Sequence, residues 1–314
     1  SKAMHFTVSE SEAGTRLDKL LVQRVAGLGR AGVKRLFSLG KVRVRTELEG
    51  RAHRASKGEV AQGGQVIEVD VEEHSVDAVP DPEAPLHVVF ETAQLLVLEK
   101  PAGQPTAPLQ PGEKGSLANA LVARHPEVKS CGFSAREPGL CHRLDTDTSG
   151  LVLAARDPVV FDTLVAGLRE GRLDKRYLLV CSAEDLGESG TIDIPLAPHP
   201  KDRRRVLACT HPRDVHRLEP RAASTSWTKL REHGGLALVE ARAPRALRHQ
   251  IRAHFAAIGH PLVGDALYGG EQGRGIARHA LHAARIAWPG DAVVPAFVVS
   301  SPLPEDIAAL VPEG

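Results

Sequence analysis

Apolar residues recur at helical spacing in the first part of the chain. Leucines at positions 17, 20 and 21 predict one amphipathic helix, and Val33, Leu36 and Phe37 predict a second. The spacing then changes to strict alternation over Val42–Arg45, which is typical of a short half-buried strand, and Gln65–Asp70 predicts another strand. These elements describe a small domain of two helices followed by strands, over residues 5–72.

A different pattern begins near residue 86. Short apolar runs of strand type alternate with helical patterns from there onward, and the runs cover residues 87–90, 95–100, 150–156, 176–181 and 236–241. Their lengths and order predict a mixed α/β domain over residues 86–314. Residues 73–85 contain three prolines and several acidic residues. This composition predicts an extended, exposed linker between the two domains.

The composition is that of a globular chain, with 42% apolar and 25% charged residues among 314. No stretch approaches the roughly 20 apolar residues that span a bilayer, so we expect no membrane association. Four cysteines, Cys131, Cys141, Cys181 and Cys209, are widely spaced and form no CxxC pair. We therefore expect free thiols in a cytoplasmic protein and no zinc site.

The net charge is only +1, but the charges are unevenly distributed along the chain. Residues 16–57 hold twelve Lys or Arg against three acidic residues, whereas residues 59–91 hold nine acidic residues and no Lys or Arg. This reversal predicts a basic working surface in the first domain, followed by an acidic segment.

Residues 14–71 resemble the RNA-binding domain of the ribosomal-protein-S-four type, the alpha-L motif. The matching residues are Gly14, Arg16, Leu17, Asp18, Gly40, Val42, Val44 and Gly64. The chain departs from that pattern at Gly29–Ala31, where such domains usually carry serines, and at Arg45, where asparagine is common. The resemblance implies an RNA-binding surface, with Arg16, Arg30, Lys34, Arg35 and Arg43 as candidates. The alternative is a generic basic module whose arginines are only solvated.

A carboxylate flanked by basic residues lies at the centre of the second domain. Residues 139–150 read GLCHRLDTDTSG, so Asp145 follows His142 and Arg143 and precedes small hydroxyl residues and a glycine. These residue types favour a local turn. Because such loops are common, this string alone does not identify a catalytic site.

The string HRLDTDTSG resembles the signature of the RluA family of pseudouridine synthases, from which it differs only by Thr146 in place of lysine. Further motifs of that family occur in order at Glu99–Gly103, Lys175–Tyr177, His249–Arg252, Gly259–Leu262 and Ala280–Ala283. The resemblance covers about residues 88–310. Where the family usually has glycine and arginine, this chain has Ala246 and Leu247, and Arg245 or Arg248 is the candidate to replace that arginine.

The resemblance implies that Asp145 is the nucleophile of a uridine-to-pseudouridine isomerase. The reaction breaks the bond between nitrogen and ribose, rotates the base and rejoins it through carbon. Carboxylates act as nucleophiles in retaining glycosidases, and one carboxylate suffices here if uracil leaves as a delocalised anion. Whether Asp145 attacks the sugar, attacks the base or takes a sugar proton stays open. Asp147 is the competing carboxylate, and we expect it to serve the turn.

Arg252 and Tyr177 complete the catalytic set that the resemblance implies. Burial disfavours a charged carboxylate, and an arginine beside Asp145 offsets this with a permanent charge. His249 and Arg252 are three residues apart, so on a predicted helix they share one face. Tyr177 is expected to lie against a flipped uracil. The remaining RNA-binding candidates are His142, Arg143, Lys175, His249 and Gln250.

The combined expectation is an α+β protein. A small N-terminal alpha-L RNA-binding domain precedes a pseudouridine synthase domain with a central, mostly antiparallel sheet. We expect a monomer that isomerises specific uridines, in large-subunit ribosomal RNA. No cofactor is expected, because an isomerisation needs no redox partner, and the histidine spacing predicts no metal site. The alternatives are an inactive homologue that binds RNA as an assembly factor, and a synthase acting on transfer RNA.

Overall fold

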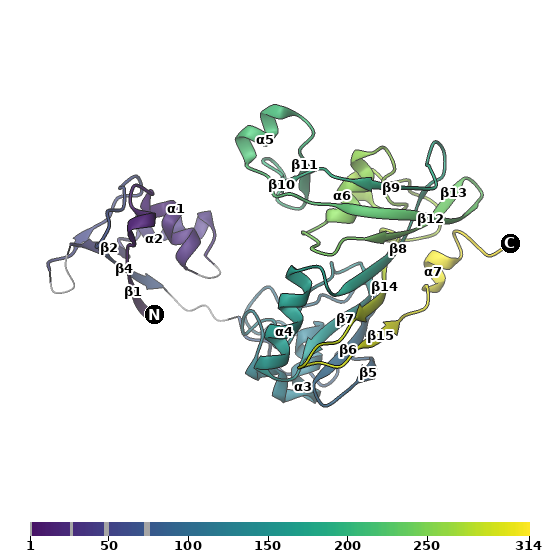
Figure 1. Ribbon diagram of the computed structural model, residues 1–314, viewed down its shortest axis with the longest axis horizontal. Coiled ribbons are helices and arrows are strands. Elements are labelled where there is room, and N and C mark those ends of the chain that lie inside the picture. Colours follow the sequence, from purple (N-terminus) through teal and green to yellow (C-terminus); the bar gives the residue numbers. More distant parts are fainter. Residues whose placement is uncertain (1, 26–27, 47–49, 72–75) are drawn as a thin grey trace. The chain divides into compact units, whose positions relative to one another are not determined.

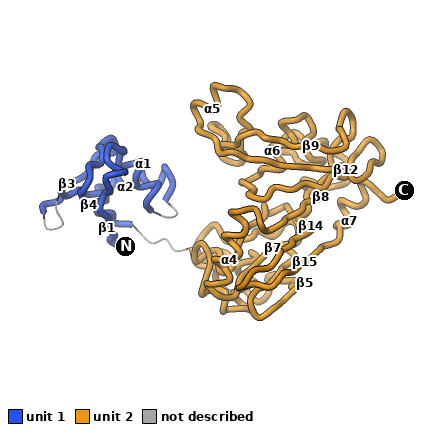
Figure 2. Tube along the Cα trace, in the orientation of Figure 1, with its two compact units in different colours: residues 1–75 blue, residues 76–314 orange. Residues whose placement is uncertain are grey.

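The computed structural model describes residues 2–25, 28–46, 50–71 and 76–314. The chain divides into two compact units, residues 1–75 and residues 76–314 (Figure 2). Each unit has its own hydrophobic core.

The first unit contains a four-stranded antiparallel sheet with the strand order β1-β4-β2-β3. Its elements are β1 (Lys2–Thr7), a 3₁₀ turn (Glu10–Glu12), α1 (Leu17–Arg24), α2 (Arg30–Ser38), β2 (Val42–Arg45), β3 (His53–Arg54) and β4 (Val66–Val71). Both predicted helices and both predicted strands are confirmed. The apolar faces of α1 and α2 pack with Val42, Val44 and Ile67 in one core. β1 and β3 were not predicted.

The second unit is built on a nine-stranded, mostly antiparallel sheet (Figure 1). The strand order is β5-β6-β7-β14-β8-β13-β12-β9, and β15 pairs with β14 beside this path. The strands are β5 (Val88–Glu91), β6 (Leu95–Lys100), β7 (Ser149–Ala155), β8 (Asp174–Ser182), β9 (Ser189–Ile192), β12 (Thr225–His233), β13 (Leu236–Arg242), β14 (Leu281–Trp288) and β15 (Phe297–Ser300). Each of the five predicted apolar runs forms a strand, and only β7 and β14 pair in parallel.

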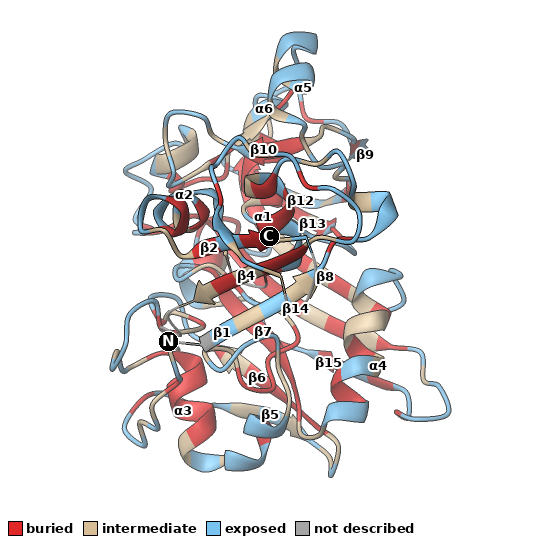
Figure 3. Cartoon of the chain, turned by 90° about the vertical axis from the view of Figure 1, so that its left-hand side faces the viewer, coloured by how far each residue is buried: buried red, intermediate tan, exposed pale blue. Residues whose placement is uncertain are grey.

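Helices pack on both faces of β6 and β7. The helices of the second unit are α3 (Leu117–Arg124), α4 (Pro158–Arg169), α5 (Pro212–Leu218), α6 (Gln250–Ala257) and α7 (Glu305–Ala308). One core joins α3 to Leu96, Leu98 and Val152, and another joins α4 to the alternate residues Leu95 and Leu151. Because side chains alternate across a strand, β6 and β7 face apolar groups on both sides. β7 is buried along its whole length (Figure 3), which explains its unbroken apolar run.

A small hairpin lies beside the main sheet. It consists of β10 (Leu196–Pro198) and β11 (Val206–Ala208), and α5 follows it. These elements project together from one end of the second unit (Figure 1). Two 3₁₀ turns, Pro126–Ser130 and Ala266–Tyr268, complete the unit. In the described part of the chain, no helix combines the length and apolar character needed to cross a membrane.

The predicted linker over residues 73–85 is corrected in part. Residues 73–75 lie outside the described residues, but residues 76–85 belong to the second unit. Ala78 and Ala84 are buried, the Asn119 side chain donates to the carbonyl of Val79, and Asp81 accepts from Gly115 N–H. The prolines do make this segment irregular. Its alanines and its hydrogen-bonding groups nevertheless find partners on the fold, so it is neither free nor uniformly exposed.

Candidate functional site

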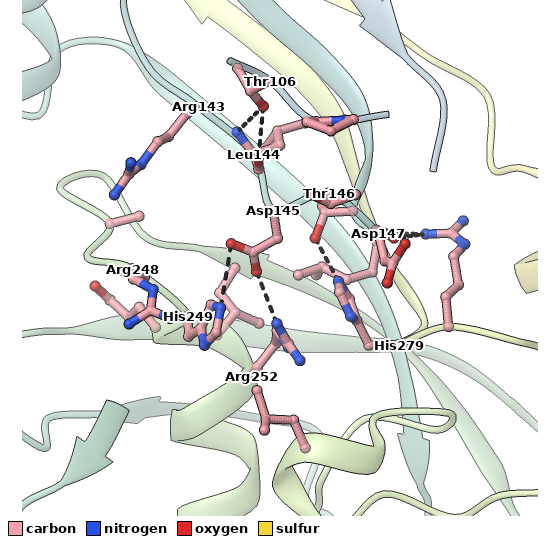
Figure 4. A pocket seen from close by; sticks show the side chains of 18 of the residues that line it. Thr106, Arg143, Leu144, Asp145, Thr146, Asp147, Arg248, His249, Arg252 and His279 are labelled. Atoms are coloured by element: carbon pink, nitrogen blue, oxygen red, sulfur yellow. Dashed lines mark hydrogen bonds and ion pairs between the residues drawn. The ribbon is translucent and has the colours of Figure 1, made fainter. Parts of the chain in front are cut away.

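A cavity of about 860 Å³ opens in the second unit beside the loop that carries Asp145. Residues of that loop, of β8, of the start of α6 and of the loops around residues 265 and 278 line it (Figure 4). The sequence motifs at Asp145, Tyr177 and Arg252 are far apart in the chain, and the structure brings all three to this one cavity.

The Asp145 loop is fixed by contacts from distant segments. The Thr106 hydroxyl donates to the carbonyl of Leu144 at 2.7 Å and accepts its N–H at 3.2 Å. The ammonium of Lys100 donates to the carbonyl of Thr146 at 2.9 Å. Lys100 is fully buried, and this burial lowers its pKa to about 8. These contacts hold the backbone on both sides of Asp145.

The turn predicted after Asp145 is present. The N–H of Thr148 donates to the carbonyl of Asp145, and Arg278 donates to the carbonyl of Asp147 at 3.0 Å. His279 pairs with the hydroxyl of Thr148 at 2.7 Å. The Asp147 side chain is exposed, which agrees with a role in the turn and not in the buried part of the site.

Gly150 allows the close approach that ends this loop. Its φ is 123°, a conformation that side chains disfavour, and a Cβ there would lie 2.2 Å from the carbonyl oxygen of Ala283. β7 and β14 pair at this point. The glycine at the end of the signature string therefore sets where the loop joins the sheet.

Arg252 holds two carboxylates at once. Its Nε and Nη2 donate to Asp265 at 2.8 and 2.9 Å, and its Nη1 donates to Oδ2 of Asp145 at 3.1 Å. The side chains of Arg252 and Asp265 are 8% and 1% exposed, whereas Asp145 is 28% exposed. Burial opposes the charge of Arg252, but the hydrogen bonds that it donates to Asp265, together with the negative charges of Asp265 and Asp145, outweigh burial and raise the Arg252 pKa. Asp145 is thus the carboxylate of the pair that remains open to a substrate.

His249 approaches the other oxygen of Asp145. Its Nε2 lies 3.7 Å from Oδ1 (Figure 4). Burial, with smaller effects from Arg252 and Arg248, lowers the His249 pKa to about 4 against the opposing influence of Asp145. The expected shared helix face is corrected here. His249 precedes α6 as its N-cap residue with a left-handed φ of 57°, and Arg252 lies within the helix.

Tyr177 and Lys175 extend from β8 toward the cavity and are 6% and 7% exposed. The Lys175 ammonium lies 5.9 Å from the centre of the Tyr177 ring. His142 also lines the cavity, but its Nε2 accepts the N–H of Leu153 at 3.0 Å. Burial lowers the pKa of His142 well below its usual range. This histidine is therefore neutral and serves β7 as an acceptor.

The Gln250 side chain, a predicted RNA contact, lines the cavity but is bonded inside the fold. Its side chain is 3% exposed, donates to the carbonyl of Ser224 and the hydroxyl of Thr225, and accepts the N–H of Leu247. The amide is used up inside the fold, where it anchors the start of α6. Arg143, in contrast, is exposed at the cavity.

The basic candidates of the first unit are all on its surface. Arg16, Arg30, Lys34, Arg35 and Arg43 are exposed. Arg16 forms an ion pair with Asp18, and Arg43 donates to the carbonyl of Ala52. They remain candidates for RNA contact.

The unusual pair Ala246 and Leu247 lies at the junction with the hairpin. Leu247 packs against the small core formed by Leu196, Val206 and Ala253. The side chain of Arg248 lines the cavity and donates to the carbonyls of Arg203 and Arg204. Of the two arginines considered as a replacement, Arg248 is the one at the cavity.

Sequence reasoning did not assign several residues that shape the site. Asp265 follows the Gly259–Leu262 motif by three positions, but its pairing with Arg252 crosses a loop and has no periodicity to reveal it. The residues Lys100, Thr106, Arg278 and His279, which anchor the Asp145 loop, also bond across long stretches of sequence, and no periodicity reveals these contacts. Among the described residues, no group of three or more His, Cys, Asp or Glu is arranged to hold a metal ion.

Comparison with known proteins places this site in a family. The pattern of the family described as RNA pseudouridylate synthase matches residues 94–257. The chain belongs to this family. Pseudouridine synthases are isomerases, and the matched segment contains Asp145, Tyr177 and Arg252.

Similar proteins carry the same family name. An RNA pseudouridine synthase of Aquifex aeolicus is 31% identical over 86% of this chain and 81% of its own length. The ribosomal large subunit pseudouridine synthase D of Xanthomonas campestris is 31% identical over 96% of this chain and 90% of its own length. The structure of human RNA Pseudouridylate Synthase Domain Containing 1 shares the fold, with a TM-score of 0.58 and 24% identity over 74% of this chain and 88% of its own.

Proposed function

We propose that this pseudouridine synthase isomerises specific uridines in large-subunit ribosomal RNA with Asp145 as its nucleophile. The observation that carries the proposal is the arrangement of Asp145, whose Oδ2 is bound by the buried Arg252 while the side chain stays 28% exposed. A nucleophilic carboxylate must be oriented and accessible, and both features of Asp145 support this proposal.

The cavity suits a flipped nucleotide. Its volume of about 860 Å³ is within the range of roughly 300–1,000 Å³ of small-ligand pockets. An extruded base needs a surface to stack on, and Tyr177 offers a ring in this cavity. Arg143 is exposed at the same cavity, where a cation can bond to the RNA phosphates beside the flipped nucleotide.

The substrate class rests on the relatives and on charge. Relatives in Xanthomonas campestris and Xylella fastidiosa are named ribosomal large subunit pseudouridine synthase D, and they match 96% and 97% of this chain. We infer that the first unit is an alpha-L RNA-binding domain whose exposed Arg30, Lys34, Arg35 and Arg43 contact phosphates. Transfer RNA is the second candidate substrate.

The test is a pseudouridine map of cellular RNA from cells with the protein, without it and with Asp145→Asn. Sites in large-subunit ribosomal RNA that vanish in both mutant strains support the proposal. Sites lost only from transfer RNA would change the substrate. Sites that persist with Asp145→Asn would remove Asp145 as the nucleophile, and RNA binding without any lost site would favour an assembly factor.

A further inference from the structure

Tyr268 connects the β10–β11 hairpin to His249, the histidine that approaches Asp145. It ends the 3₁₀ turn Ala266–Tyr268, and its hydroxyl accepts the backbone N–H of Val206 at 2.9 Å. The same hydroxyl lies 2.8 Å from Nδ1 of His249. On the other side of the imidazole ring, Nε2 lies 3.7 Å from Oδ1 of Asp145. A continuous line of polar groups therefore runs from Val206 to Asp145.

The positions of the protons follow from this line. The Val206 N–H occupies one lone pair of the Tyr268 oxygen, so the hydroxyl proton is free to point at Nδ1 of His249. The neutral imidazole then carries its own proton on Nε2, facing Asp145. The opposite tautomer would direct the Nε2 lone pair at a carboxylate oxygen, which is repulsive. The lowered pKa of His249, due to its burial, agrees with a neutral ring.

Packing holds the two rings in this arrangement. The rings of His249 and Tyr268 meet edge to face, with centroids 5.6 Å apart and planes at 84°. The guanidinium of Arg252 lies 5.1 Å from the centre of the Tyr268 ring. Removing the hydroxyl of Tyr268 alone would leave these ring contacts in place.

We propose that Tyr268 is a positioning residue, which fixes the tautomer of His249 so that its Nε2–H faces the free oxygen of Asp145. This inference rests on the proposed function, because it assigns Asp145 as the reacting group. Arg252 restrains one carboxylate oxygen and His249–Tyr268 restrains the other. The Nε2–Oδ1 distance of 3.7 Å is longer than a hydrogen bond. Such catalytic contacts are often long without substrate and tighten in the complex.

This series of contacts from Val206 to Asp145 begins next to a basic loop. Val206 directly follows Lys201–Arg205, and Arg248, the residue before His249, donates to the carbonyls of Arg203 and Arg204 at 3.2 and 2.8 Å. The hairpin and the start of α6 are therefore joined by Arg248 as well as by Tyr268. The Val206 bond orients the Tyr268 hydroxyl, and the hairpin contributes to the geometry at Asp145 through it.

The first experiment compares Tyr268→Phe with the wild type in full-length protein. The substrate is a large-subunit ribosomal RNA transcript labelled with tritium at uridine C5, which is released as the new carbon bond forms. We expect kcat to fall about tenfold, while KM and RNA affinity stay within about twofold, because the hydroxyl acts only on the reacting carboxylate. An unchanged kcat would overturn the proposal, as would a loss confined to RNA affinity.

Ser301→Ala is the matched control. The Ser301 hydroxyl pairs with Nε2 of His282 at 3.0 Å, so the variant also removes a hydroxyl bonded to a buried histidine, this one on β14 outside the lining of the cavity. We expect it to lower the melting temperature and leave kcat near that of the wild type. If both variants lower kcat in proportion to their loss of stability, the role of Tyr268 is only structural and the proposal fails.

Substitutions of His249 test the tautomer independently. Asn can accept from Tyr268 but lacks a donor at the Nε2 position, whereas Gln places an amide N–H there. We expect kcat of His249→Gln to exceed that of His249→Asn, and His249→Asn to equal His249→Ala. Adding Tyr268→Phe to His249→Ala should cost nothing more, since the hydroxyl acts through His249.

The proposal would be overturned if the Gln and Asn variants were equally active. It would also be overturned if the losses of activity in Tyr268→Phe and His249→Ala were additive in the double variant. If Tyr268→Phe does not fold, the contrast between Gln and Asn at position 249 decides alone. A wild type that releases no tritium from ribosomal or transfer RNA would instead refute the proposed function.

Discussion

Arg252 gives two of its hydrogen bonds to Asp265, a carboxylate that is only 1% exposed. These two bonds restrain the guanidinium, and its remaining Nη1 is directed at Asp145. The buried Arg252–Asp265 pair therefore fixes the orientation of the Asp145 carboxylate. Preorganised charge of this kind avoids reorganisation during the reaction.

We expect Asp145→Asn to lower turnover by about 10³-fold or more, since the amide keeps the shape but lacks the nucleophile. RNA affinity and melting temperature should change little, because the amide oxygen still accepts from Arg252. Tritium release and filter binding measure the two properties. Asp147→Asn is the control on the same loop, and its exposed side chain predicts turnover near that of the wild type. Turnover in Asp145→Asn close to that of the control would refute the mechanism.

Arg252→Ala should reduce both turnover and stability. It leaves Asp265 as a buried, unpaired charge, which costs about 3–5 kcal/mol in the free energy of unfolding. Adding Asp265→Asn should restore part of that stability without restoring turnover. Arg252→Lys should be intermediate, because an ammonium keeps the charge and loses the fork. Urea unfolding and tritium release separate the effects, and wild-type turnover in Arg252→Ala would contradict the pairing with Asp145.

Elements with a clear period were predictable from the sequence. β6 and β7 are continuous apolar runs because both of their faces are buried, and α1 and α2 show one apolar stripe because one face of each packs on a sheet. The linker prediction missed that residues 76–85 belong to the second unit, since proline and acidic content do not show that Ala78 has a buried place on the fold.

The site was predictable only as far as motif strings reach. They named Asp145 and Arg252, which meet at 3.1 Å across 107 positions of sequence. They did not show that Arg252 is shared with Asp265, that His249 takes a left-handed N-cap conformation, or that Gln250 is turned inward. Each of these depends on which loop packs against the start of α6, and such contacts leave no periodic trace.

Tyr177→Phe and Tyr177→Ala should separate stacking from proton transfer. If the ring stacks on the flipped base, Phe should retain most of the turnover and Ala should lose about ten- to hundredfold, because stacking is worth about 1–3 kcal/mol per base. Single-turnover rates on the labelled transcript give the comparison. Equal losses in both variants would assign the effect to the hydroxyl, and no loss in either would remove Tyr177 from the site.

Stability should fall in mild acid. Burial lowers the pKa values of His249, His279 and His282 from 6.5 to about 4. Below pH 6.5 these histidines bind protons in the unfolded chain but remain neutral in the folded chain. The free energy of unfolding therefore decreases as the pH falls toward 4. Each histidine contributes at most about 1.4 kcal/mol per pH unit. Urea unfolding between pH 7.5 and 5 should show this slope, and His282→Gln should make it shallower. A flat profile across that range would contradict the buried neutral state.

Neutralising the first unit should weaken the salt dependence of RNA binding. The variant changes Lys34, Arg35 and Arg43 to Gln, and its matched control changes Lys129, Arg169 and Arg274, which are exposed on the second unit outside the lining of the cavity. Each phosphate contact contributes about 0.7 to 0.9 to the slope of log affinity against log salt, through counterion release. We expect the slope to drop by about two in the first variant and to stay unchanged in the control. Affinity for a ribosomal RNA fragment, measured between about 50 and 200 mM salt, gives both slopes.

The rate constant for isomerisation at saturating RNA should be the same in the wild type and in both variants, because these cations are not in the cavity. Identical slopes for the two variants would mean that the basic surface of the first unit is only solvated and that the second unit holds the RNA.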